Sequence, residues 1–117
     1  MSPPGSVGRL GAAHSIGAVP AYVVVETRVT DPQRATRYRP LSAASVERHG
    51  GRFLARGGAI AVFEGTWHPD RLVVIEFPSV EKAREWYESE DYRAAREIRS
   101  GAGEWRIVVV EGVAPSV

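Results

Sequence analysis

The chain has 117 residues, of which 44% are hydrophobic and 25% are charged, and its net charge is +1. This composition is typical of one globular domain, and its balanced charge creates no field that would attract nucleic acid or an anionic membrane. The chain lacks cysteine, which excludes disulfides, thiolate catalysis and zinc–thiolate sites. It also lacks a bilayer-spanning apolar run and a signal-peptide pattern, so we expect a cytoplasmic protein.

Residues 1–19 are rich in Gly, Ser, Pro and Ala and show no hydrophobic period. We therefore expect a disordered leader, followed by a domain at 20–113 and a tail at 114–117. The first strand is predicted at 21–29. Its side chains alternate between two faces: Tyr22, Val24, Glu26 and Arg28 share one, and Val23, Val25, Thr27 and Val29 share the other.

A helix is predicted to begin at Asp31-Pro32, an N-cap followed by a first-turn proline, and to end at Gly50-Gly51. Apolar and aromatic residues recur between these limits at three- and four-residue steps. Pro40 lies inside this segment. An interior proline costs about 3 kcal/mol and disfavours helical geometry at the residue before it. We therefore expect a kink, or two segments that meet at residues 38–40.

Extended structure follows the helix. Residues 52–56 (RFLAR) predict a short strand, and Gly57-Gly58 predicts a turn or bulge. Residues 59–64 (AIAVFE) predict a continuation of that strand, because their apolar side chains suit a pleated surface. Residues 65–70 predict a loop.

The run at 71–77 (RLVVIEF) is long enough for a strand and too short for a buried helix. Both of its faces are apolar except at Glu76, which is typical of a central strand. Pro78 ends the strand because it has no N–H to donate to a neighbouring strand. Ser79 is then the expected N-cap of a helix.

Helical periodicity continues past a second expected N-cap at Ser89 to about residue 99, and residues 105–111 predict the last strand. The order strand, helix, strand, strand, helix, strand predicts an α+β protein with ferredoxin-like βαββαβ topology. Its four strands would be antiparallel, with the first and the central strand in the middle. The helices would cover one face and leave the other, if apolar, for a partner.

Two residues are candidates for acid–base catalysis, and each has a structural alternative. His49 ends the first helix, where an imidazole could serve as general base or could simply favour the negative end of the helix dipole. Glu76 could orient a substrate or take a proton. Alternatively it is a structural carboxylate that pairs with one of the nearby arginines, Arg56, Arg71 or Arg28.

Four residues are candidates for substrate binding. The hydroxyls of Tyr38 and Tyr92 could donate to a ligand in a cleft between sheet and helices, although most aromatic side chains belong to cores or interfaces. Arg56 or Arg71 could hold an anion. No nucleotide-binding, metal-ligating or nucleophile-elbow motif is found, so no cofactor or metal is predicted.

Five strings occur in this order: HGGRFLARGG (49–58), EG and W at 64–67, RLVVIEFPS (71–79), WY, S and Y at 86–92, and VVVEGV (108–113). Over residues 20–113 the chain resembles domain-of-unknown-function family 1330. The resemblance implies a ferredoxin-like fold that dimerises, sheet against sheet, as an α+β barrel. It implies no established reaction, although the wider superfamily includes cofactor-free monooxygenases, haem-degrading enzymes and lactone isomerases. Pro40 and Trp105-Arg106 depart from the usual pattern.

Two functions follow as hypotheses. In the first, the protein is a homodimer that binds a small molecule in the cleft. If it is an enzyme, we expect cofactor-free acid–base chemistry on a small organic acid or aromatic compound, in which His49 is the base, Arg56 or Arg71 holds the anion and Glu76 orients them. In the second, it is a non-catalytic dimeric binding or structural module. Convergence of His49 and Glu76 on one pocket would favour the first. In both, the face bearing Tyr22, Val24, Leu72 and Val74 would pack against its twin.

Overall fold

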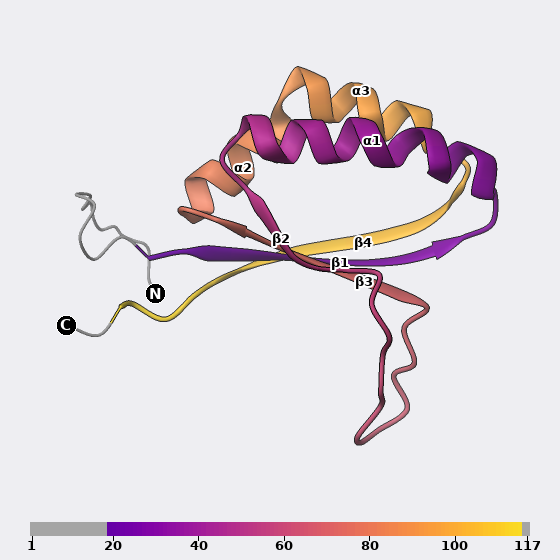
Figure 1. Cartoon of the computed structure of the whole chain (residues 1–117), viewed down its shortest axis with the longest axis horizontal. Coiled ribbons are helices and arrows are strands. Elements are labelled where there is room, and N and C mark those ends of the chain that lie inside the picture. Colours follow the sequence, from indigo (N-terminus) through magenta and orange to yellow (C-terminus); the bar gives the residue numbers. More distant parts are fainter. Residues whose placement is uncertain (1–18, 116–117) are drawn as a thin grey trace.

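A computed structural model describes residues 19–115. Helices cover one face of a four-stranded sheet and leave the other uncovered, and we call these the helix-covered face and the open face (Figure 1). The elements, in chain order, are β1 (Ala21–Val29), α1 (Pro32–Arg48), β2 (Arg52–Arg56), β3 (Arg71–Phe77), α2 (Val80–Glu88), α3 (Glu90–Ile98) and β4 (Gly103–Glu111). The leader predicted at 1–19 lies almost wholly outside the described residues.

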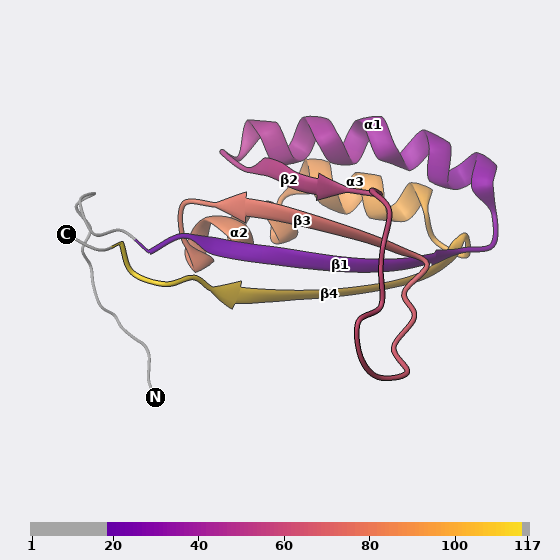
Figure 2. The same ribbon diagram turned by 60° about the horizontal axis from the view of Figure 1, so that its bottom comes forward.

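The strands lie in the order β2-β3-β1-β4 (Figure 2), and every neighbouring pair is antiparallel. The predicted ferredoxin-like topology is therefore confirmed, with β1 and β3 in the middle. Strand β1 pairs with β3 from Ala21 to Thr27 and with β4 along its whole length. Its alternating pattern is also confirmed, because Val23, Val25 and Thr27 are buried under the helices.

The predicted helix starts are confirmed by their side chains. Asp31, Ser79 and Ser89 each accept a hydrogen bond from the backbone N–H three residues later, at 3.3, 3.1 and 3.2 Å. These bonds satisfy N–H groups that the first helical turn leaves without a partner. At the other end of α1, Gly50 has the left-handed φ of +82° that the Gly-Gly pair predicted.

The predicted strand at 59–64 is wrong. After β2 the chain leaves the sheet, and residues 57–70 form a long loop on the side away from the helices (Figure 1). Ile60, Val62 and Phe63 remain exposed, with 95% of Phe63 accessible. Strand-like residues form a strand only where a neighbouring strand supplies hydrogen bonds and packing. Within the described chain, no strand lies beside this segment.

Of the two alternatives predicted at Pro40, the division into two segments is wrong, because α1 is one helix of 17 residues that contains Pro40, and the kink stays a prediction. The proline removes one hydrogen bond, to the carbonyl of Thr36, and both residues are exposed so that water can bond to this carbonyl. Tyr38 on one side of the proline and Val46 on the other are buried. Burial of both halves against the same core keeps the helix continuous.

The core lies between the helices and the sheet, and its largest fully buried side chains are Trp86, Tyr92 and Phe77. The indole N–H of Trp86 donates to the hydroxyl of Ser45 at 3.0 Å, and the Trp86 and Tyr92 rings lie 4.2 Å apart. This buried polar contact joins α2 to α1 without leaving a donor unpaired.

None of the helices in residues 19–115 has the length and apolar character needed to cross a bilayer.

Gly103 starts β4 opposite Val29, with a φ of +150°. A Cβ at this position would lie 2.9 Å from the Cα of Val29 and would overlap the carbonyl oxygen of Arg28. We expect Gly103→Ala to lower the free energy of unfolding by about 1–3 kcal/mol, measured by urea denaturation. Gly58→Ala is the control, because a Cβ there meets nothing within 4 Å. Equal effects of the two substitutions would contradict this account.

Candidate binding site

A cavity of about 410 Å³ lies between α1 and the helix-covered face of the sheet. This volume falls within the range of roughly 300–1,000 Å³ that is common for small-molecule sites. Most of its lining is apolar and comes from all four strands and α1, including Val25, Pro40, Phe53, Val73, Ile75 and Trp105. The cavity therefore suits a ligand with an apolar body.

Three arginines line this mostly apolar cavity: Arg39 from α1, Arg56 from β2 and Arg71 from β3. Burial, followed by the positive charges of Arg39 and Arg56, lowers the pKa of Arg71. Among the described residues, no carboxylate lies within 4.0 Å of any of the three guanidinium groups. Three cations that repel one another beside an apolar space favour binding of an anion.

Gly57 allows Arg71 to occupy its position. Its φ is +74°, and its N–H donates to the carbonyl of Leu72 at 3.0 Å. The guanidinium of Arg71 lies directly against the Gly57 backbone, because a Cβ built there would come within 2.8 Å of its central carbon. A glycine is thus required at this point both by the backbone conformation and by the space that the arginine takes.

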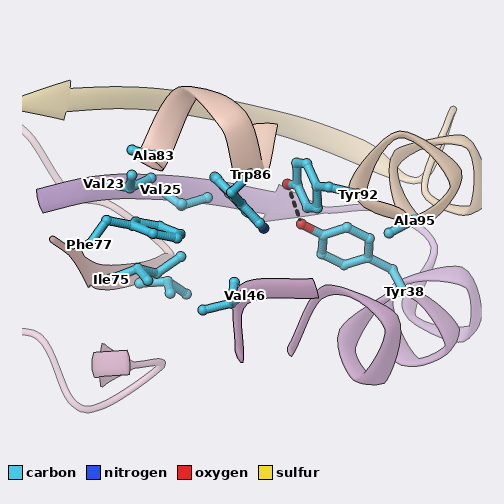
Figure 3. Packing of buried hydrophobic residues seen from close by; sticks show 11 residues of the cluster. Val23, Val25, Tyr38, Val46, Ile75, Phe77, Ala83, Trp86, Tyr92 and Ala95 are labelled. Atoms are coloured by element: carbon cyan, nitrogen blue, oxygen red, sulfur yellow. Dashed lines mark hydrogen bonds between the residues drawn. The ribbon is translucent and has the colours of Figure 1, made fainter. Parts of the chain in front are cut away.

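Tyr38 and Tyr92 both line the cavity, and their hydroxyls point toward each other (Figure 3). The two oxygens are 2.6 Å apart and the rings meet edge to face. Burial, the neighbouring Tyr38 hydroxyl and its hydrogen bond raise the pKa of Tyr92 well above the usual range of a tyrosine, and Arg99 opposes this shift. Tyr92 therefore keeps its proton at neutral pH and serves as a hydrogen-bond donor or acceptor.

The two predicted catalytic residues are not brought together. His49 lies at the C-cap of α1, where its Nδ1 is 2.9 Å from the carbonyl oxygen of Ser45. Glu76 lies on the open face and forms an ion pair with Arg52 at 2.7 Å. Neither lines the cavity. The predicted pairing of Glu76 with Arg56, Arg71 or Arg28 is therefore wrong, because its partner is Arg52. Catalysis by His49 or Glu76 stays a prediction.

By contrast, all four predicted substrate-binding residues (Tyr38, Arg56, Arg71 and Tyr92) line the cavity. No site role was predicted from the sequence for Arg39, Gly57 or Thr27. Thr27 carried a detectable signal, because it is the one polar residue on the inward face of β1. Arg39 carried none, since its place depends on α1 continuing through Pro40.

A second hollow of about 600 Å³ lies between β4 and the α2–α3 pair. Its arginines already have aromatic partners. Arg96 donates to the Tyr87 hydroxyl at 3.1 Å and to the Tyr87 carbonyl at 3.2 Å, and Arg99 lies 4.6 Å from the Trp105 ring centre. Aromatic contact does not distinguish the two spaces, because Arg56 of the first cavity lies 4.3 Å from the Phe53 ring centre. No Asp or Glu of the described chain lines the first cavity, whereas Glu88 lines the second, so we take the first cavity as the candidate anion site. Among residues 19–115, no cluster of three His, Asp or Glu is placed to hold a metal ion.

The family model described as domain of unknown function, DUF1330, matches residues 20–113. The chain belongs to the DUF1330 family. No curated protein matches this DUF1330 chain in sequence.

Solved structures similar to this DUF1330 chain share its fold. A protein of unknown function from Rhodopseudomonas palustris is 22% identical, with a TM-score of 0.68 over 84% of this chain and 85% of its own. A candidate antibiotic biosynthesis monooxygenase from Caulobacter crescentus is 16% identical, with a TM-score of 0.55 over 84% and 93%. A dimeric ferredoxin-like protein from Thermobifida fusca is 13% identical, with a TM-score of 0.50 over 87% and 99%. At these identities the likeness shows the fold alone.

The raised pKa of Tyr92 predicts a loss of stability at alkaline pH. Above about pH 10 a tyrosine in the unfolded chain ionises, whereas folded Tyr92 keeps its proton. The unfolded state is then favoured by up to about 1.4 kcal/mol per pH unit. Tyr92→Phe should cost about 1 kcal/mol near neutrality, through the lost hydrogen bond. Its deficit against wild type should shrink between about pH 9 and pH 11 in denaturation curves. A deficit that stays constant over this interval would contradict the burial of this hydroxyl.

Proposed function

We propose that this protein binds a small organic anion in the cavity between α1 and the sheet. The observation that carries the proposal is the convergence of Arg39, Arg56 and Arg71 on an apolar space with no carboxylate beside them among the described residues. An anionic group would relieve the repulsion between the guanidinium groups, which form strong charge-assisted hydrogen bonds with carboxylates. The apolar lining would hold the rest of the ligand.

The cavity supports binding more directly than catalysis. Its own proton-bearing pair, Tyr38 and Tyr92, is suited to hold a ligand oxygen, because Tyr92 does not act as a base near neutral pH. Acid–base catalysis by His49 and Glu76 would require them to approach the cavity, and each has a partner elsewhere. The similar fold of a candidate monooxygenase, which is 16% identical, does not imply that this chain catalyses the same reaction.

Arg71→Gln should weaken binding of a simple aromatic acid, with benzoate and phenylacetate as probes. Loss of one charge-assisted contact should lower the affinity about tenfold or more. Thermal shift measures this, since a ligand at about 100 times its Kd adds about 2.7 kcal/mol to stability. Arg37→Gln on the exposed side of α1 is the control, because it changes the charge equally outside the cavity. Equal affinities of the two variants would overturn the proposal.

We also propose that the protein is a homodimer in which two open faces pack together. The face carries Tyr22 and Val24 from β1, paired across the sheet with Val110 and Val108. Val108 and Val110 are 62% and 53% exposed. An exposed apolar patch of this kind on one part of the face is typical of an interaction surface. The similar fold from Thermobifida fusca is that of a dimeric protein.

Val108→Glu should convert the dimer into a folded monomer in sedimentation experiments at micromolar concentration, because a carboxylate would have to be buried between the sheets. Leu41→Glu is the matched control, since Leu41 is 46% exposed on α1, on the helix side of the sheet. It should leave the dimer intact. A wild-type monomer at that concentration would refute the dimer.

A further inference from the structure

One of the hydroxyls that line the cavity, that of Thr27, is buried without a hydrogen-bond partner among the described residues. Thr27 is only 5% exposed. Val25 and Val29, which precede and follow it on the same face of β1, also line the cavity. A buried hydroxyl without a partner destabilises a protein, whereas a valine of the same shape would not. Its presence therefore points to a bonding partner that enters the cavity.

The strand register places Thr27 between two other cavity residues. It lies opposite Arg71 on β3 and opposite Trp105 on β4. Residues directly opposite each other on neighbouring strands share a face, so the indole, the hydroxyl and the guanidinium form a row across the sheet. The Tyr38 ring meets the Trp105 ring edge to face at 5.7 Å. A ligand along this row would meet an aromatic wall, a hydrogen-bonding group and a cation in turn.

We propose that the ligand is an organic acid with a second oxygen, in a hydroxyl or keto group, and that the Thr27 hydroxyl selects for that oxygen. This inference rests on the proposed anion site. A threonine hydroxyl both donates and accepts, so it can bond to either kind of oxygen. A site that contains such a group discriminates against the analogue without the oxygen, because its own polar group is then left unpaired. A purely apolar wall does not discriminate in this way.

The test compares matched acids on matched variants. Benzoate against its three monohydroxy derivatives, and 3-phenylpropionate against phenyllactate and phenylpyruvate, are titrated by calorimetry into wild type, Thr27→Val and Thr27→Ser. We expect at least one oxygenated acid to bind wild type about tenfold more tightly than its parent acid. Thr27→Val should remove this preference without weakening the parent acid, because the parent makes no bond to the hydroxyl and leaves it unpaired. Thr27→Ser keeps the hydroxyl and should retain the preference.

The wild-type series alone can overturn the inference if parent and oxygenated acids bind with equal affinity, so the test does not depend on every variant folding. The inference would also be overturned if Thr27→Val lowered the affinities of the parent acid and of the oxygenated acid equally. If Arg71→Gln weakens binding but the second oxygen makes no difference to affinity, the selection by Thr27 is refuted and the proposed anion site is still supported. If none of the acids binds in an Arg71-dependent way, both proposals fail.

Discussion

Strand β1 is hydrogen-bonded on both sides, to β3 and to β4. Its side chains therefore alternate between the helix-covered face and the open face of one sheet. Val23, Val25 and Thr27 point to the helices, while Tyr22 and Val24 point to the open face. A shift of one residue would exchange the two sets. This register therefore fixes at once which residues form the core, which form the cavity and which form the surface that a second copy could cover.

The side chains around the cavity differ from those in the rest of the core, because they include polar groups that do not serve packing. Close to Phe77 and Trp86 the aromatic rings pack tightly and the indole N–H is hydrogen-bonded to Ser45. Nearer the start of α1, the same layer holds the cation Arg71 and the hydroxyl of Thr27, which lacks a partner among the described residues. Departures from local consistency of this kind are expected where a protein binds something. The contrast between the two ends of one layer therefore supports the proposed ligand site alongside the three arginines.

Much of the fold could be predicted from the sequence, because its signals are local: alternation in β1, capping oxygens and glycine positions all concern neighbouring residues. The errors at 59–64 and at Pro40 arise where tertiary contacts decide the outcome. Apolar alternation cannot reveal whether a neighbouring strand exists, and the cost of a proline cannot reveal that both halves of a helix are buried. The sequence places His49 at a helix end, but its local pattern does not show that His49 lies outside the cavity lining or that Glu76 lies on the opposite face of the sheet.

Strand β3 connects the two proposed functions, because its residues alternate between them. Arg71 and Val73 line the cavity, whereas Leu72 and Val74 belong to the open face. Neighbouring residues thus lie on opposite sides of a sheet that hydrogen bonds hold on both edges of the strand. A ligand under α1 and a second copy on the open face would therefore share one wall without sharing a contact surface. If the sheet remains rigid, dimer formation and ligand binding should depend on separate side chains, even though one strand positions both.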